Sequence, residues 1–216
     1  MSTDTTANPF DTGNEENERL ALEECVKRQR VDHQVSVLVI SANRCELAKK
    51  FSRLGAHVTI ADQAGKSQEV QGRILADGLS DSIGFVPATL DNLPETIAGQ
   101  PFDIIYVRRG LCYMPYEQAR AVVRQLLLKL KIGGKLYVSI LGLHSALGEG
   151  YDGSELPIDQ RFTPLAPGLA RKYEIDAPVC LYTERNLFML LLESGASVLR
   201  TLTTTYGNVF GIGVRV

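Results

Sequence analysis

The stretch VSVLVISANRCELAKKFSRLGAHVTIAD, residues 35–62, decides the fold. It opens with a run of apolar and mostly β-branched side chains, which is typical of a strand buried on both faces of a parallel sheet. A helix follows, because Leu47, Phe51 and Leu54 have the i, i+4, i+7 spacing of one helix face. A second strand then ends in an acidic residue, Asp62. Strand, tight turn, helix, strand and closing acid are the layout of a nucleotide-cofactor site.

The same alternation continues through most of the chain. Further helices are expected at about 15–30, 67–79, 117–131 and 183–195, and further strands at 83–90, 102–107, 135–141, 197–206 and 209–216. The helix over 117–131 is expected to stop at Gly133-Gly134. Only Gly207 and Asn208 separate the last two strands, so these must form an antiparallel hairpin. The sequence therefore predicts an α/β fold, a doubly wound, Rossmann-like sheet of seven mostly parallel strands with an antiparallel C-terminal hairpin.

Composition excludes several classes of protein. A chain of 216 residues fits one domain, and a formal net charge of -2 offers no broad basic surface for nucleic acid. The four cysteines form no CxxC pair and no cluster with histidine, so we expect no metal site and reduced thiols in the cytoplasm. No apolar run is long enough to span a bilayer, and the polar start lacks the pattern of a signal peptide.

The chain is expected to divide into a short tail and one domain. Residues 1–14 offer almost nothing to bury and are predicted to be a disordered tail, which leaves 15–216 as the domain. Residues 142–182 are long for a loop in a compact domain and predict a lid over the carboxyl ends of the strands. Within that lid, His144 and Tyr151 are candidate substrate contacts, with His144 also a candidate general base.

Two segments resemble a known family. FDIIYVRRGLCYMPYEQARAVVRQLLLKLKIGGKLYVSIL, residues 102–141, is similar to the stretch of class I S-adenosylmethionine-dependent methyltransferases that runs from their fourth strand to their fifth. LYTERNLFMLLLESGASV, residues 181–198, resembles the segment that leads into their sixth strand. A dinucleotide-binding dehydrogenase shares the first half of this layout, but the terminal hairpin favours the methyltransferase fold. The resemblance implies S-adenosylmethionine as cofactor and a small molecule as methyl acceptor.

The turn after the first strand departs from the pattern of that family. The family places an acid at the strand end and then G-x-G-x-G, which lets the backbone approach the cofactor. Here the acid falls on Val39 and the glycines on Ser41, Asn43 and Cys45, so the motif is degenerate. Ser41, Ala42 and Asn43 remain the expected cofactor contacts, because serine is small and asparagine tolerates a positive φ.

Other expected contacts lie at the ends of the later strands. Asp62 stands where the family uses an acid to bind the ribose hydroxyls, and Thr89 stands where an acid binds the adenine amine. Leu90 is expected to pack on the adenine, and Arg108 to contact the cofactor. Beside it lie Arg109 and Tyr113, which are candidate contacts to the methyl acceptor.

Two interpretations remain open. In the first, the protein is an active methyltransferase with a divergent cofactor turn. In the second, it is a catalytically inactive protein of the same fold that acts as a binding or regulatory subunit, in a homo- or hetero-oligomer. The architecture and Asp62 favour the first, while the altered turn and Thr89 favour the second.

Overall fold

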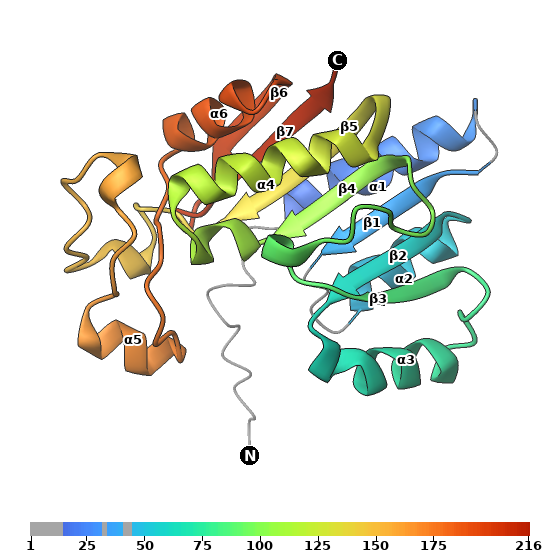
Figure 1. Cartoon of the computed structure of the whole chain (residues 1–216), viewed down its shortest axis with the longest axis horizontal. Helices are drawn as coiled ribbons and strands as arrows, with labels where there is room; N and C mark the ends of the chain where they lie inside the picture. The colour runs from blue at the N-terminus through green and yellow to red at the C-terminus, as the bar shows by residue number, and fades with distance from the viewer. Residues whose placement is uncertain (1–14, 32–33, 41–44) are drawn as a thin grey trace.

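The computed structural model describes residues 15–31, 34–40 and 45–216. The tail expected at 1–14 lies outside this part of the chain. Seven strands form one sheet in the order β3-β2-β1-β4-β5-β7-β6 (Figure 1). Their bounds are Ser36–Ile40 (β1), His57–Asp62 (β2), Ile83–Pro87 (β3), Phe102–Arg108 (β4), Leu130–Ile140 (β5), Ala196–Thr203 (β6) and Val209–Arg215 (β7).

The pairing of the strands confirms the predicted topology. β1 pairs in parallel with β2 and β4, β2 pairs in parallel with β3, and β4 pairs in parallel with β5. β7 runs antiparallel to both β5 and β6, so the C-terminal hairpin is confirmed. The chain winds outward from β1 to β3 and then returns to the other side of β1 with β4. The carboxyl ends of β1 and β4 therefore form a topological switch point, where ligands of open α/β sheets bind.

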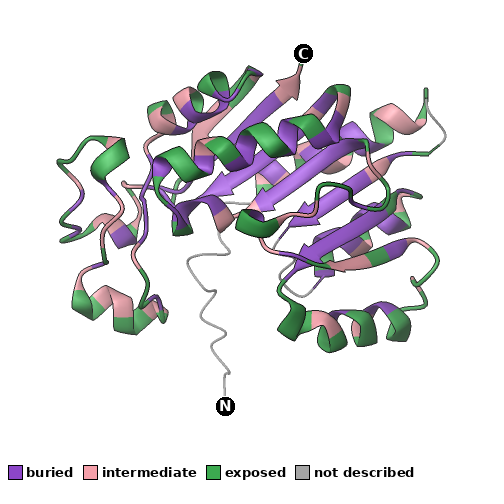
Figure 2. Ribbon diagram, viewed as in Figure 1, coloured by how far each residue is buried: buried purple, intermediate pink, exposed green. Residues whose placement is uncertain are grey.

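Helices cover both faces of the sheet. The helices are Glu15–Gln29 (α1), Glu46–Arg53 (α2), Ser67–Ala76 (α3), Tyr116–Lys129 (α4), Pro167–Tyr173 (α5) and Glu184–Glu193 (α6). The alternation of side chains along β1 separates two cores, because Leu38 and Ile40 pack with α4 and α6 whereas Val37 and Val39 pack with α1 and α2. Figure 2 shows the buried sheet and the exposed outer side of α4.

The boundary between α4 and β5 differs from the sequence-based prediction. α4 ends at Lys129 rather than 131, and the Gly133-Gly134 pair lies inside β5 rather than between helix and strand. The register between β4 and β5 shifts at this point, and Gly133 takes a φ of 75°. Pairing of Leu130 with Phe102 on β4 places Leu130 in the strand, although its apolar side chain also suits the end of a helix.

Candidate functional site

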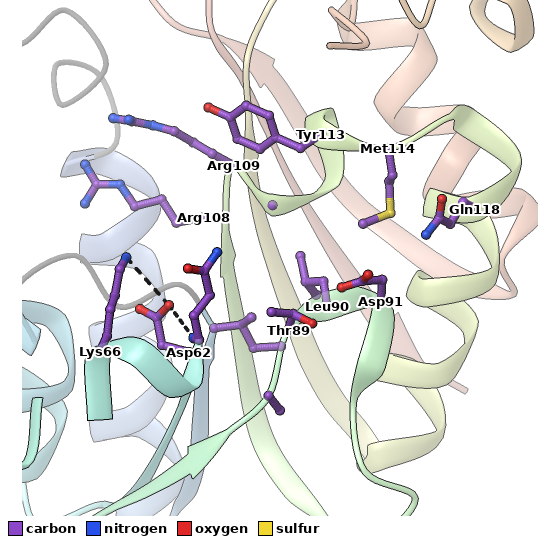
Figure 3. Close-up of a pocket in the computed structure, with 14 residues that line it drawn as sticks. Asp62, Lys66, Thr89, Leu90, Asp91, Arg108, Arg109, Tyr113, Met114 and Gln118 are labelled. Carbon is purple, nitrogen blue, oxygen red and sulfur yellow. Dashed lines mark hydrogen bonds and ion pairs between the residues drawn. The ribbon is translucent and has the colours of Figure 1, made fainter. Parts of the chain in front are cut away.

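A pocket opens at the carboxyl ends of β1, β2 and β4, at the switch point (Figure 3). Its volume is about 550 Å³, which is within the usual range for a small-molecule site. Three groups of residues line it. The first group begins at the last residue of β2, the second follows β3, and the third begins at the last residue of β4 and reaches the first turn of α4. Ile40, at the end of β1, also lines the pocket.

Asp62 is the buried acid of the first group. Its side chain is 6% exposed, and Oδ1 accepts a hydrogen bond from the backbone N–H of Gln63 at 2.8 Å. Lys66 Nζ lies 3.7 Å from the same oxygen. Oδ2 is buried and receives no hydrogen bond from the described residues. A buried acceptor without a partner costs roughly 1–3 kcal/mol, so a ligand hydroxyl that donated to Oδ2 would recover that energy.

The second group places a carboxylate that sequence reasoning missed. Thr89 and Leu90 line the pocket, and Leu90 is 8% exposed. The short helix over Leu90–Asn92 also brings Asp91 to the wall, where its carboxylate points into the cavity in Figure 3. The only signal in the sequence was that an acid stands two residues after Thr89, and a turn of helix was needed to bring it inward.

At the end of β4, two consecutive arginines line the pocket. Arg108 Nη1 lies 3.6 Å from Oε1 of Glu18 on α1. Arg109 has a φ of 60°, in the left-handed region that favours glycine. Its N–H donates to the carbonyl of Ser139 at 2.7 Å and its own carbonyl accepts from the N–H of Cys112 at 3.2 Å, which holds this conformation. Strained backbone of this kind costs about 1–3 kcal/mol and is often found at functional sites.

Tyr113 completes this wall, together with Met114 and Gln118, which the sequence had not indicated. Its side chain is 43% exposed. Partial burial raises the pKa of Tyr113 to about 12, with the nearby Cys112 adding to the rise and Arg109 opposing it. The phenol is therefore protonated at neutral pH and offers a hydrogen-bond donor to the pocket.

Two of the predicted substrate contacts lie elsewhere. The Tyr151 side chain is buried, and its hydroxyl donates to the carbonyl of Val179 at 2.6 Å, within the segment 142–182. His144 is exposed, in the turn after β5. Neither residue lines the pocket, so the structure does not bring them together with Arg109 and Tyr113. Tyr151 instead holds its own segment together.

The predicted lid is a packed segment that lies beyond the carboxyl end of β5 (Figure 1). It contains α5 and is fastened by Arg161, which is 8% exposed. The Arg161 guanidinium donates to the carbonyls of Leu156 at 2.8 Å and Leu181 at 3.2 Å and to Oδ1 of Asn186 at 3.0 Å. None of residues 142–182 is among the described residues that line the pocket. Covering of the pocket by this segment stays a prediction.

The first turn is only partly described. Ser41, Ala42 and Asn43 lie outside the described residues. Cys45, which stands at the last glycine position of the motif, has a φ of 62° and is 1% exposed. The backbone thus keeps a left-handed conformation at this point although the residue is not glycine. Val39 is 3% exposed and belongs to the core of α1 and α2.

Other classes of site find no support in the described residues. No group of three histidine, cysteine or acidic side chains is placed there to hold a metal ion. In the same ranges, no helix has the length and apolar character needed to cross a membrane.

Comparison with solved structures identifies the fold. A methyltransferase from Clostridium acetobutylicum ATCC 824, described as S-adenosylmethionine-dependent, has a TM-score of 0.70 and 12% identity, over 94% of this chain and 92% of that one. The 1,6-didemethyltoxoflavin-N1-methyltransferase of Burkholderia thailandensis, with bound 1,6-didemethyltoxoflavin and S-adenosylhomocysteine, has a TM-score of 0.65 and 16% identity. The match covers 94% of this chain and 79% of that one. The apo form of the S-adenosylmethionine-dependent methyltransferase SibL has a TM-score of 0.61 and 16% identity, over 92% and 55%.

The lengths of these proteins differ. The chain spans 55% of SibL and 54% of the mitomycin 7-O-methyltransferase MmcR, but nearly the whole of the clostridial protein. No protein-family model matches the sequence, and no curated protein matches it. The likeness therefore lies in the three-dimensional arrangement of the elements.

Proposed function

Because the chain has the fold of the class I S-adenosylmethionine-dependent methyltransferases, we propose that its pocket binds S-adenosylmethionine and that it transfers the methyl group to a small molecule. The observation that carries this proposal is the unpaired Oδ2 of Asp62, a buried acceptor at the wall of a cavity at the switch point. Bound S-adenosylmethionine supplies a methyl group on a positively charged sulfur.

Each end of the adenosine group has a partner in this proposal. Asp62 accepts hydrogen bonds from the ribose hydroxyls through Oδ2, while Gln63 and Lys66 hold the other oxygen. Leu90 packs against the adenine. Asp91 accepts from the adenine amine, a role that the side chain of Thr89 fills more weakly because a hydroxyl carries no charge.

Methyl transfer makes modest demands on the protein. Alignment of acceptor and methyl group supplies most of the rate enhancement, so an active site of this kind needs no catalytic triad. Arg109, Tyr113 and Gln118 are the polar groups that hold and orient the acceptor in this proposal, and Arg108 contacts the cofactor. The Burkholderia neighbour, whose structure contains bound 1,6-didemethyltoxoflavin, supports a small-molecule acceptor.

The second candidate is a catalytically inactive protein of the same fold. It is favoured by Cys45, whose buried side chain stands where the family has glycine, and by Val39 in place of an acid.

Under either function we propose a cytoplasmic location, since all four cysteines are free thiols in the structure.

Thermal unfolding with and without S-adenosylhomocysteine tests the proposal. A ligand at about a hundred times its dissociation constant adds roughly 2.7 kcal/mol, which raises the Tm of a domain of this size by several degrees. Asp62→Asn should remove most of that rise, whereas Asp81→Asn, at an exposed turn before β3, should keep it. No rise at millimolar ligand would refute cofactor binding.

Transfer activity separates the two candidates once binding is shown. Binding of S-adenosylhomocysteine without methyl transfer to any of a broad set of small-molecule acceptors would favour the inactive protein. Formation of S-adenosylhomocysteine that depends on an added acceptor would establish the enzyme.

A further inference from the structure

A groove runs between α1 and α2, on the face of the sheet opposite α4 and α6 (Figure 1). Its volume is about 910 Å³. Nζ of Lys50 on α2 lies 3.3 Å from Oε2 of Glu18 on α1, and the side chain of Gln29 donates to the carbonyl of Leu54. These two contacts hold α1 beside α2 near both ends of α1, so the groove is a fixed feature of this surface.

The floor of the groove is apolar. Leu22 and Val26 of α1 and Leu54 at the end of α2 line it, and Val26 is 37% exposed. Leu22 and Val26 are four residues apart, so one turn of helix brings both side chains to the same side of α1. Apolar side chains that gather on a surface within a rim of charge are typical of a protein contact.

Charges of opposite sign flank this floor at the two ends of α1. Acids occupy its first turn and basic residues its last turn. Glu15 at the start and Arg30 just after the end both line the groove, and both are exposed. The helix has 15 residues, so the two ends lie about 22 Å apart, with Leu22 and Val26 between them. The helix dipole favours this order of charges, but it does not require them to line the groove.

We propose that α1 forms the contact surface of a symmetric dimer, in which the α1 helices of two copies pack antiparallel in each other's grooves. A two-fold axis near the middle of α1 places Leu22 and Val26 of the two copies against each other. The same axis brings Glu15 of each copy to the end of α1 that carries Arg30 in the other. A parallel pairing would instead bring like charges together. A second copy of this chain is therefore the occupant that the charge order of α1 fits.

Sedimentation velocity of the full chain tests this proposal. Between about 1 and about 100 μM, the protein should shift reversibly from a monomer to a species of twice the mass. A monomer over this whole range would overturn the proposal and would leave the groove to a different protein. S-adenosylhomocysteine has no part in the measurement, so failure of the proposed function would leave this test intact.

A polar substitution in the floor tests whether the groove is the contact. Val26→Gln should raise the dissociation constant of the dimer at least about tenfold, because it replaces an apolar side chain at the middle of the interface. Leu75→Gln, at an exposed position of α3, is the matched control and should leave the constant unchanged. Circular dichroism checks that both variants are folded. A dimer that Val26→Gln does not weaken would lie on another surface, and this result would overturn the proposal.

Exchange of the two end charges tests the antiparallel arrangement. Glu15→Arg and Arg30→Glu should each raise the dissociation constant about tenfold, because each places like charges opposite one another twice in the dimer. The double variant that carries both substitutions restores opposite charges and should return to within about threefold of the unchanged protein. Any effect of the substitutions on the helix alone would add in the double variant rather than cancel. Arg185→Glu, at an exposed position of α6, should have no effect. A double variant at least as weak as the single ones would overturn the proposed arrangement.

Discussion

Lys66 Nζ lies 3.7 Å from Oδ1 of Asp62, whereas Oδ2 of the same buried carboxylate has no hydrogen-bond partner among the described residues. One oxygen is thus held by the protein, and the other is available to a ligand. An ion pair with a lysine that is 54% exposed contributes at most about 1 kcal/mol. The internal contacts of Asp62, which are the N–H of Gln63 and this weak ion pair, use Oδ1 alone.

Asp103 provides a contrast, because both of its oxygens are occupied. This side chain is 1% exposed, Oδ1 lies 3.3 Å from Arg28 Nη1, and Oδ2 accepts from Lys131 Nζ and from the N–H of Ser36, each at 2.9 Å. Asp103→Ala should lower the free energy of unfolding by about 3 kcal/mol, since it leaves those donors without their carboxylate. Urea unfolding measures this change, and a loss below about 1 kcal/mol would contradict this account of Asp103.

Stability should fall in alkaline solution. Burial raises the pKa of Cys25 from 9.0 to about 11 and that of Cys112 from 9.0 to about 12, so the folded protein holds these protons more tightly than the unfolded chain. Their contribution is fully present below pH 9 and is lost as the pH rises towards 11 and 12. The Tm should therefore decrease steadily from pH 9 to pH 11, and less steeply in Cys25→Ala. Equal slopes in the two proteins would argue against this role for Cys25.

Glycine at position 45 should be better tolerated than alanine. Cys45 has a φ of 62°, where any side chain with a Cβ adds about 1 kcal/mol that glycine avoids. Both substitutions remove the same sulfur atom, so their comparison gives the net cost of a Cβ at this φ, which is the backbone strain less the contacts that the buried Cβ makes. Cys45→Gly should be more stable than Cys45→Ala by about 1 kcal/mol in urea unfolding. The reverse order would mean that the left-handed conformation is not what this position requires.

Arg161 should hold the segment 142–182 in place. Arg161→Met removes the donors to the carbonyls of Leu156 and Leu181 and to Asn186, and leaves buried acceptors without partners. We expect a loss of about 3 kcal/mol of stability and faster limited proteolysis within 142–182. Arg171→Met, on the exposed last turn of α5, is the control. An unchanged cleavage pattern would show that Arg161 does not fasten the segment.

The fold could be predicted from the sequence because short apolar runs, typical of buried strands, alternate with segments whose apolar residues have helical spacing. The apolar run over residues 35–40 specifies a buried strand without any tertiary information, and the short gap at Gly207-Asn208 likewise specifies a hairpin. The end of α4 was predicted incorrectly, because Leu130 suits a helix and a strand equally well. Only its pairing with Phe102 on β4 decides between them.

The site was predicted in part. Asp62, Thr89, Leu90 and the residues after β4 reach one pocket because the carboxyl ends of parallel strands meet at one edge of the sheet. Asp91 could not be predicted, since a short helix after β3 turns it inward. Tyr151 was a candidate substrate contact on the chemistry of its hydroxyl alone. In the structure, that hydroxyl donates a hydrogen bond to the carbonyl of Val179 in its own segment.

Isothermal titration of S-adenosylhomocysteine into the unchanged protein and into Asp62→Asn tests the central claim most directly. We predict saturable binding at one site, and a dissociation constant at least about tenfold higher for Asp62→Asn, which keeps the acceptor for Gln63 but places an amide where the unpaired oxygen stood. The variant should unfold at nearly the same urea concentration, since Oδ2 stabilises nothing within the described chain. No heat of binding to the unchanged protein, or equal dissociation constants for the two proteins, would contradict the account.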